Sequence, residues 1–560
     1  MKKLLALLLA MIMVLSMSAI SAVAEEEELP FMTIENYNEA ANYHGVQTGW
    51  FAKVIKDRFN IELNIIAPQV AGTSVFATRA QTGNLGDILI MDKASFADAV
   101  AAGLVMDITD VLPQMPHLQQ FMVQIDSYNK DFGGKYYGIP AEMTDTSPVS
   151  LTAELVGSQP QLRWDLYQAV GAPDIPDTDA FLDVLAQIHE IHPTSEDGDP
   201  AYPFTLWPDW DNNDNMSGPA NIVQLTTWFG QKMKNSAMLM PDNTFAKITD
   251  RDVAYYTITK MLFKANQMGL VDPESFEQGW NEVCAKISAG RADVIWYNWE
   301  IGFWNSQERL DNGTAFQFIP VGDQLYYADA DPFYGSARVW GIGSQVDEEK
   351  LERIIAFLDW YASPEALVFQ HDGIEGLNYV LDENGKFVPY MDNALMDNLP
   401  VPDEFGGGGY QDGNNAINQW LCSSICTNPE TGETYDMKFW ASYIAKNMTQ
   451  MKSEWMARFD AENAVDWMKK NGKLLASPSV PFTPASDDND HALMRSEINT
   501  TLCKYTWQMI AAPDEATFEA LWDEMVAELE GLGYDDLFDY DCEKWQPEID
   551  LKIEAAAIAE

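Results

Sequence analysis

Residues 296–300, Trp-Tyr-Asn-Trp-Glu, combine three aromatic rings with an amide and a carboxylate. A sugar presents apolar C–H faces rimmed by hydroxyl groups, so a sugar site needs flat rings for stacking and polar side chains at its edge. We therefore expect Trp296, Trp299 and Glu300 to contact a carbohydrate ligand. For either tryptophan alone a core position is an equal alternative, but not for both, because neighbours on an extended chain face opposite ways.

Asp92 has the type and the position of a second ligand contact. It follows residues 88–91, an apolar run typical of a strand that is buried on both faces of a parallel sheet. Ligands of open α/β sheets collect at the carboxyl ends of the strands. An ordinary helix-capping role ahead of Ser95 is the alternative for this side chain.

Helix and strand patterns alternate along the chain and would position these residues. The spacing of apolar side chains predicts helices over 51–59, 95–103, 179–191, 351–361 and 518–529. Polar and apolar residues alternate over 61–65, as in a strand that is buried on one face. The order of these elements predicts an α/β fold.

Length and charge limit the possible architectures and partners. A chain of 560 residues is too long for one compact core, which predicts two or more lobes. The sequence has 86 acidic and 34 basic residues, a formal net charge of −52. Because this surface repels phosphate backbones and anionic lipid headgroups, we expect no nucleic-acid partner.

Residues 1–24 have the pattern of a secretory signal: Lys2 and Lys3, an apolar run over 4–15, and small residues before a cleavage site near Ala24. We expect the remaining chain to be soluble and extracytoplasmic, at the cell surface or in the periplasm. No cysteine lies near the cleavage site, so no lipobox anchor is expected. The five cysteines lack zinc-site spacing and are interpreted as free thiols, with a 422–426 or a 503–542 bridge as the alternative.

Several short segments, in order from near residue 35 to near residue 540, resemble one family. They include Gly83-Asn84-Leu85-Gly86-Asp87-Ile88, Lys135-Tyr136-Tyr137-Gly138-Ile139-Pro140, Arg163-Trp164-Asp165-Leu166-Tyr167, Gly290-Arg291-Ala292-Asp293 and Ser363-Pro364-Glu365-Ala366. Together they resemble the extracellular solute-binding proteins of bacterial ABC importers, in particular the sugar-binding branch with the maltose- and alginate-binding proteins. The resemblance implies a two-lobed periplasmic-binding-protein fold of type II, with a hinge and an interlobe cleft.

The resemblance also implies a division of the chain. We expect residues 25–142 and 280–320 to form lobe 1, and residues 143–279 and 321–560 to form lobe 2, which would include the C-terminal helices. The first crossing between the lobes is expected near residues 139–142 and another near 318–322.

The matching segments add further candidate ligand contacts. Tyr43 and His44 lie in a loop that opens into the cleft in relatives, although His44 could equally be a solvated loop histidine. Glu142 follows the expected hinge, with a structural hydrogen bond as its alternative role. Trp207 and Trp340 complete the set, although a tryptophan is more often a core residue than a ligand platform.

The combined interpretation is a receptor that closes on a small solute, with an oligosaccharide as the favoured class, and delivers it to the membrane subunits of an ABC importer. We expect a monomer with no cofactor, no bound metal and no catalytic residues. A secreted glycoside hydrolase is the main alternative, because it would share the aromatic residues and would need two carboxylates. A receptor for a peptide or a polyamine is the second alternative. No Gly-x-Ser-x-Gly, His-Glu-x-x-His or phosphate-loop motif occurs in the sequence.

Overall fold

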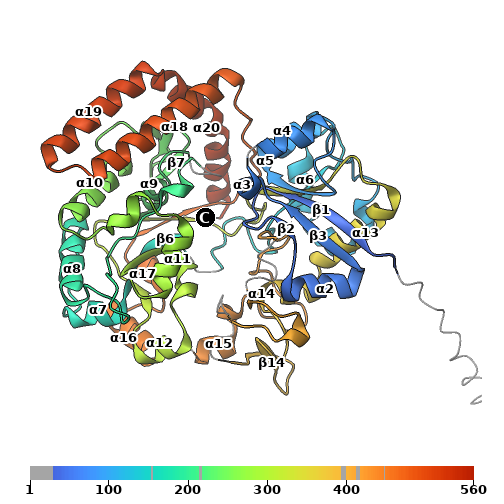
Figure 1. Cartoon of the computed structure of the whole chain (residues 1–560), viewed down its shortest axis with the longest axis horizontal. Coiled ribbons are helices and arrows are strands. Elements are labelled where there is room, and N and C mark those ends of the chain that lie inside the picture. Colours follow the sequence, from blue (N-terminus) through green and yellow to red (C-terminus); the bar gives the residue numbers. More distant parts are fainter. Residues whose placement is uncertain are drawn as a thin grey trace, which may run out of the picture.

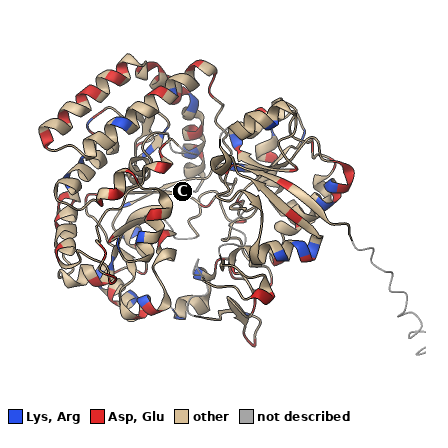
Figure 2. Cartoon of the chain, in the orientation of Figure 1, with Lys and Arg blue, Asp and Glu red and all other residues tan. Residues whose placement is uncertain are grey.

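The computed structural model describes residues 29–72, 74–152, 156–212, 217–391, 399–410, 417–446 and 448–559. The expected signal sequence, residues 1–24, lies outside these ranges. Helices and strands gather into two bodies, with the N-terminal strands in one body and the C-terminal helices in the other (Figure 1). Acidic residues are spread over both of them (Figure 2). We call the body that contains β1 the first lobe and the other the second lobe.

The first lobe is built on a six-stranded sheet with the order β2-β3-β1-β4-β13-β5. Its strands are β1 (Met32–Asn38), β2 (Gly45–Val46), β3 (Ile61–Ile66), β4 (Ile88–Asp92), β5 (Gly138–Pro140) and β13 (Arg338–Ile342). Strands β3, β1 and β4 are parallel, and β13 is antiparallel to both β4 and β5. The carboxyl ends of β1, β3 and β4 therefore meet at one edge of the sheet.

Helices cover the sheet of the first lobe because its apolar side chains must be buried on both faces. They are α2 (Gly49–Phe59), α3 (Pro68–Ala71), α4 (Ser74–Gln81), α5 (Lys93–Ala101), α6 (Met122–Asn129), α13 (Glu348–Tyr361) and α14 (Pro364–His371). A small hairpin of β14 (Tyr379–Leu381) and β15 (Phe387–Pro389) and helix α15 (Ala441–Lys446) extend this lobe. The main core joins buried residues between 34 and 143 with residues between 340 and 435.

The second lobe has a three-stranded antiparallel sheet with the order β10-β6-β11. Its strands are β6 (Ser158–Arg163), β10 (Val294–Tyr297) and β11 (Phe316–Phe318). A second small sheet contains β7 (Lys232–Lys234), β8 (Ala237–Leu239) and β9 (Phe245–Lys247), and β12 (Tyr326–Asp329) pairs in parallel with β16 (Leu474–Ser477).

Helices make up most of the second lobe. They are α7 (Trp164–Ala169), α8 (Thr178–Ile191), α9 (Ala220–Leu225), α10 (Ala254–Gln267), α11 (Trp280–Ser288), α12 (Gln307–Asn312), α16 (Gln450–Phe459), α17 (Ala464–Lys470), α18 (Asn489–Ile510), α19 (Glu515–Gly531) and α20 (Tyr534–Ala559). The single large core joins buried residues between 156 and 328 with residues between 451 and 537.

The chain passes between the two cores three times: after Thr144, after Ala330, and between α15 and α16. Backbone hydrogen bonds join the first two crossing segments to each other and the second one to the end of β16. The amide of Asp331 donates to the Ser150 carbonyl (2.7 Å), and the amide of Ala330 donates to the Ser477 carbonyl (2.8 Å). The first crossing therefore begins just beyond the expected segment at residues 139–142.

The division of the chain differs from the expected one at two segments. Residues 280–320, expected in lobe 1, carry β10 and β11, which both pair with β6 in the second lobe. The described residues between 338 and 446, expected in lobe 2, belong to the first lobe, because β13 completes its sheet between β4 and β5 and residues up to 435 are buried in its core. The segment at 318–322 is consequently no crossing, since Phe318 pairs with Gln161 and is buried in the second core.

Candidate ligand-binding site

A continuous cluster of aromatic rings lies at the end of β10 in the second lobe. Its members are Trp207, Trp210, Trp280, Trp296, Tyr297, Trp299 and Phe303. The rings of Trp207 and Trp296 stack 4.9 Å apart and nearly parallel. Tyr297 and Trp299 form a second stacked pair, also 4.9 Å apart, and Trp280 links the two pairs.

The cluster runs from the core to the surface. Trp296 is 1% exposed, and its indole N–H donates to Gln224 Oε1 (2.8 Å), whereas Trp299 is 42% exposed. One tryptophan thus lies in the core and one outside it, although the reason differs from the expected one: Trp296 is on β10, whereas Trp299 lies in the turn after this strand. Trp299 therefore presents a ring that is already fixed by its neighbours, which lowers the entropy cost of stacking on a ligand.

Glu300 stabilises the aromatic loop through hydrogen bonds to its backbone, whereas we expected this residue to contact the ligand. Its side chain is buried, and its Oε2 atom accepts hydrogen bonds from the backbone N–H groups of Trp296 and Tyr297, both at 2.8 Å. Burial raises the pKa of this carboxyl to about 8, against the opposing effect of the two N–H donors. Glu300 therefore sets the conformation from which Trp299 projects.

The raised pKa of Glu300 makes stability depend on pH. Between about pH 4.5 and about pH 8 the folded protein keeps a proton that the unfolded chain has released, so the free energy of unfolding falls as pH rises. The slope from one proton is at most about 1.4 kcal/mol per pH unit. Glu300→Gln keeps the shape and the acceptor but cannot ionise, so its stability relative to wild type should increase over this range. Urea unfolding at a series of pH values measures the difference, and a constant difference would contradict a protonated Glu300.

Carboxylates also gather at the carboxyl edge of the sheet in the first lobe. The backbone N–H of Asp92 donates to Glu39 Oε2 (2.9 Å), and Arg338 lies opposite, with its Nε 3.8 Å from Asp92 Oδ1. Burial raises the pKa of Glu39 to about 7, and the nearby charge of Asp92 adds to this effect. Asp92 precedes α5, but its side chain accepts no capping hydrogen bond from this helix. The structure therefore does not support the helix-capping alternative.

Glu142 lies beside this group, at the end of the first lobe's chain before the first crossing. Its backbone has a φ of 57°, a left-handed conformation that is uncommon for a glutamate. Burial raises the pKa of its carboxyl, while a hydrogen bond to Ser336 and the charge of Arg338 oppose the rise. The guanidinium group of Arg338 is thus surrounded by hydrogen-bond acceptors from Glu39, Asp92 and Glu142.

Tyr43 and His44 are exposed near the same edge, but their polar atoms bind the loop. The Tyr43 hydroxyl donates to the carbonyl of Val46 (2.6 Å), and Nδ1 of His44 accepts a hydrogen bond from the N–H of Ala67 (3.2 Å). These bonds connect the segment after β1 to the ends of β2 and β3. Their rings remain accessible for a ligand contact.

Trp207 and Trp340 differ from the expectation, since both are 1% exposed and lie in the cores. Trp207 supports Trp296 from behind, and Trp340 of β13 packs on Tyr361 with ring centroids 5.2 Å apart. Neither ring is accessible to a ligand in this conformation.

The sequence did not predict three members of the site: Glu39, Trp280 and Tyr297. Glu39 directly follows β1, so the rule that selected Asp92 would also have selected it.

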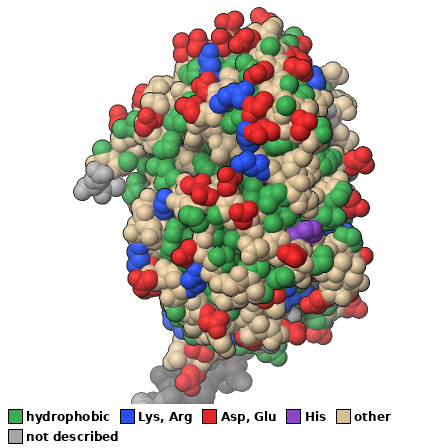
Figure 3. Space-filling view, turned by 90° about the vertical axis from the view of Figure 1, so that its left-hand side faces the viewer, with side chains coloured by type: hydrophobic (Ala, Val, Ile, Leu, Met, Phe, Trp, Pro, Cys, Tyr) green, Lys and Arg blue, Asp and Glu red, His purple; other side chains and the backbone are tan. Residues whose placement is uncertain are grey.

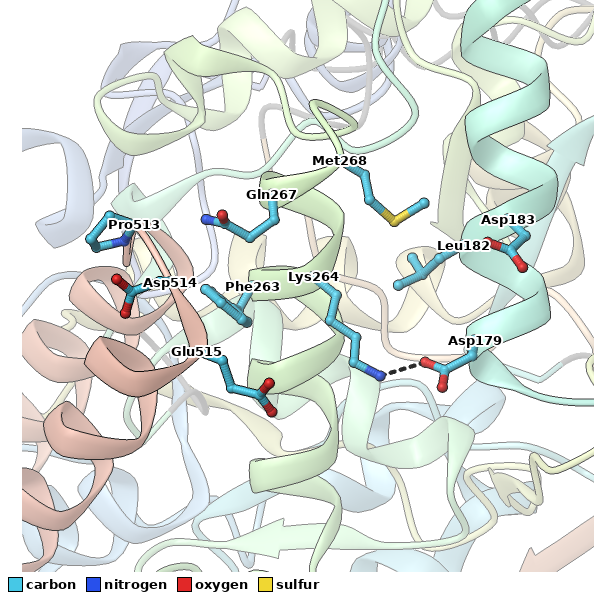
Figure 4. A pocket seen from close by; sticks show the side chains of 10 residues that line it. All are labelled: Asp179, Leu182, Asp183, Phe263, Lys264, Gln267, Met268, Pro513, Asp514 and Glu515. Atoms are coloured by element: carbon cyan, nitrogen blue, oxygen red, sulfur yellow. Dashed lines mark hydrogen bonds and ion pairs between the residues drawn. The ribbon is translucent and has the colours of Figure 1, made fainter.

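A separate hollow of about 420 Å³ lies on the second lobe, between α8, α10 and the turn into α19. Acidic side chains line it, and its one lysine, Lys264, is held by Asp179 at 2.6 Å (Figure 4). The outer side of this lobe shows more acidic than basic side chains (Figure 3). None of the expected site residues lines this hollow. Within the described ranges, no His, Cys, Asp and Glu side chains converge in a way that would hold a metal ion.

The sequence matches the family model of the bacterial extracellular solute-binding protein over residues 44–368, which is more than half of the chain. The chain belongs to this family. Lipoprotein LipO of Bacillus subtilis (strain 168) is 25% identical over 308 residues, which cover 53% of this chain and 57% of the relative. The chain thus spans little more than half the length of that relative.

Across the part of the chain that the structure describes, no helix has both the length and the apolarity needed to cross a membrane.

Solved structures of solute-binding proteins share the fold over nearly the whole chain. FusA of S. pneumoniae, solved with kestose, has a TM-score of 0.59 at 15% identity and covers 92% of this chain and 99% of its own. A solute-binding protein of Bifidobacterium longum infantis, described as binding HMO, has a TM-score of 0.57 at 14% identity, with 93% and 99% coverage. The two-lobed α/β fold expected from the sequence is thereby confirmed, together with the family.

Proposed function

We propose that this solute-binding protein captures a carbohydrate between its lobes and delivers it to an ABC importer. The observation that carries the proposal is Trp299, a half-exposed ring held by a stack of aromatic side chains that reaches into the core. Carbohydrate recognition needs such a ring, together with acceptors for hydroxyl groups. Glu39, Asp92 and Glu142 of the first lobe supply the acceptors. The ligands given for two proteins of the same fold, kestose for FusA and HMO for the Bifidobacterium protein, support the same ligand class.

Capture uses only binding energy. The two cores are connected by three crossing segments, so the lobes can rotate as rigid bodies about them. A ligand that contacts both lobes stabilises the closed form, because it makes its full set of contacts only there. The importer then recognises that closed form. The protein acts as a monomer outside the cytoplasm, performs no chemical reaction on the sugar, and loses its signal sequence near Ala24.

A glycan screen tests this proposal through melting temperature and product analysis in parallel. A ligand that binds only the folded protein stabilises it by about 2.7 kcal/mol at a concentration of about 100 times Kd. We expect a raised melting temperature with at least one oligosaccharide, and unchanged sugar in the mixture afterwards. New sugar products would identify a hydrolase, and stabilisation by peptides or polyamines alone would replace the carbohydrate.

A further inference from the structure

Four lysines gather where the second lobe approaches the first. Lys232 and Lys234 belong to β7, Lys552 belongs to α20, and Lys93 is the first residue of α5 in the first lobe. Helix α20 lies at the edge of the second lobe that faces the first lobe (Figure 1). The carboxylate of Glu548 on α20 interacts electrostatically with Lys93, so the first-lobe lysine lies within range of the charges on that helix. In a chain with only 34 basic against 86 acidic residues, this concentration is unusual.

Two carboxylates form ion pairs with ammonium groups of this set. Lys234 pairs with Glu548 (2.5 Å) and Lys232 with Asp329 (2.5 Å). Lys552 shares the same two acids, at 3.2 Å from Glu548 and 3.9 Å from Asp329. Lys93 forms no ion pair within 4.0 Å among the described residues. The group, which we call the lysine cluster, therefore has two more positive than negative charges.

The lysine cluster is partly buried and partly exposed. Lys234 and Lys552 are buried, whereas Asp329 keeps 55% of its side-chain surface and Lys232 keeps 31%. Burial lowers the pKa values of Lys93 and Lys234 to about 8, so both remain largely charged at pH 7. Aromatic rings lie beside the ammonium groups: Tyr327 is 5.0 Å from Lys232, and Trp545 is 4.3 Å from Lys234.

We propose that the lysine cluster binds an acidic group of the carbohydrate, so that the ligand is an oligosaccharide with carboxylate or sulfate substituents. A partly buried cation without a counter-ion is costly, and an anionic ligand removes this cost by pairing with it. Lys93 comes from the first lobe and the other three from the second, so an acid bound among them favours closure. This inference rests on the carbohydrate receptor proposed above and specifies its ligand.

Calorimetric titration with matched sugars tests the inference: a tetramer of 1,4-linked galacturonic acid, a sulfated tetramer of 1,4-linked galactose, and the neutral tetramer. We expect at least one acidic tetramer to bind about tenfold tighter than the neutral one, the value of one charge-assisted hydrogen bond. Lys93→Gln and Lys232→Gln, both on partly accessible side chains, should lower the affinity for the acidic tetramer about tenfold more than the affinity for the neutral tetramer. Lys264→Gln, in the outer hollow, is the matched control and should change nothing.

Each other outcome overturns the inference in a distinguishable way. Equal affinity of wild type for acidic and neutral tetramers refutes the acidic ligand but leaves the carbohydrate receptor intact. An equal loss for both sugars in the lysine variants, at unchanged melting temperature, shows that the cluster only attracts the lobes to each other through Glu548. Failure of wild type to bind either acidic tetramer, while a neutral sugar of the glycan screen binds, refutes the inference alone. Failure to bind the tetramers and every sugar of the glycan screen refutes the receptor function as well.

The pH dependence gives an independent readout. Affinity for the acidic tetramer should fall as pH rises from about 7 to about 10, because Lys93 and Lys234 lose their protons in this range. The groups that face them are Lys232, Lys552, Asp329, Glu548 and Tyr327, and the two carboxylates stay ionised throughout. Affinity for the acidic tetramer that stays constant to pH 10 would contradict the inference.

Discussion

Trp299→Ala should weaken carbohydrate binding by about tenfold or more, since truncation of a central aromatic contact costs about 2 kcal/mol or more. The ring is 42% exposed and touches the cluster with its edge and one face, so its loss should lower stability only slightly. Calorimetric titration with the best oligosaccharide from the glycan screen measures the change in affinity, and thermal unfolding monitors the fold.

The matched control for Trp299 is Trp299→Phe, which keeps a flat ring at the same place. We expect it to recover part of the affinity, because a smaller ring still stacks on a sugar face. If the alanine variant binds as tightly as wild type, the aromatic cluster is a packing feature and the ligand lies elsewhere.

Trp296→Ala should instead lower the free energy of unfolding by about 3–5 kcal/mol, the usual cost of removing a large buried aromatic side chain. Its ring is 1% exposed, stacks on Trp207 at 4.9 Å, and holds Gln224 through its N–H. Urea unfolding measures the change. Any loss of ligand affinity should follow from disorder in the loop that carries Trp299, so it should be smaller at low temperature.

Trp296→Phe separates volume from hydrogen bonding at this position. The phenyl ring fills most of the space but leaves Gln224 without its donor, so we expect an intermediate loss of stability. An alanine variant with wild-type stability and lost affinity would show that Trp296 itself contacts the ligand, as the sequence alone suggested.

The local elements of the fold could be predicted from the sequence, but the division into lobes could not. Alternation over 61–65 and the apolar run at 88–91 correspond to β3 and β4, because side-chain periodicity reflects local burial. The place of β13 depends on pairing with β4 and β5, which lie about 250 and about 200 residues earlier in the chain. Such pairing leaves no periodic signal in the strand, so residues 280–320 and 338–446 were expected in the opposite lobes.

For the site, the residue types could be predicted from the sequence, but the burial of each side chain could not. The sequence excluded a core position for both tryptophans, and the structure buries Trp296 on β10 and exposes Trp299 in the turn that follows. Glu300, Trp207 and Trp340 have the residue types of a sugar site, but partners from distant segments bury them. The lysine cluster could not be foreseen, because Lys93, Lys232, Lys234 and Lys552 come from three separate parts of the chain and no motif connects them.

A crystal structure with a bound oligosaccharide tests the central claim most directly. The account predicts one sugar ring stacked on Trp299, hydroxyl groups in contact with Glu39, Asp92 or Glu142, and lobes that have rotated together about the three crossing segments. A sugar held by one lobe alone, or seated in the outer hollow beside Phe263, would contradict it.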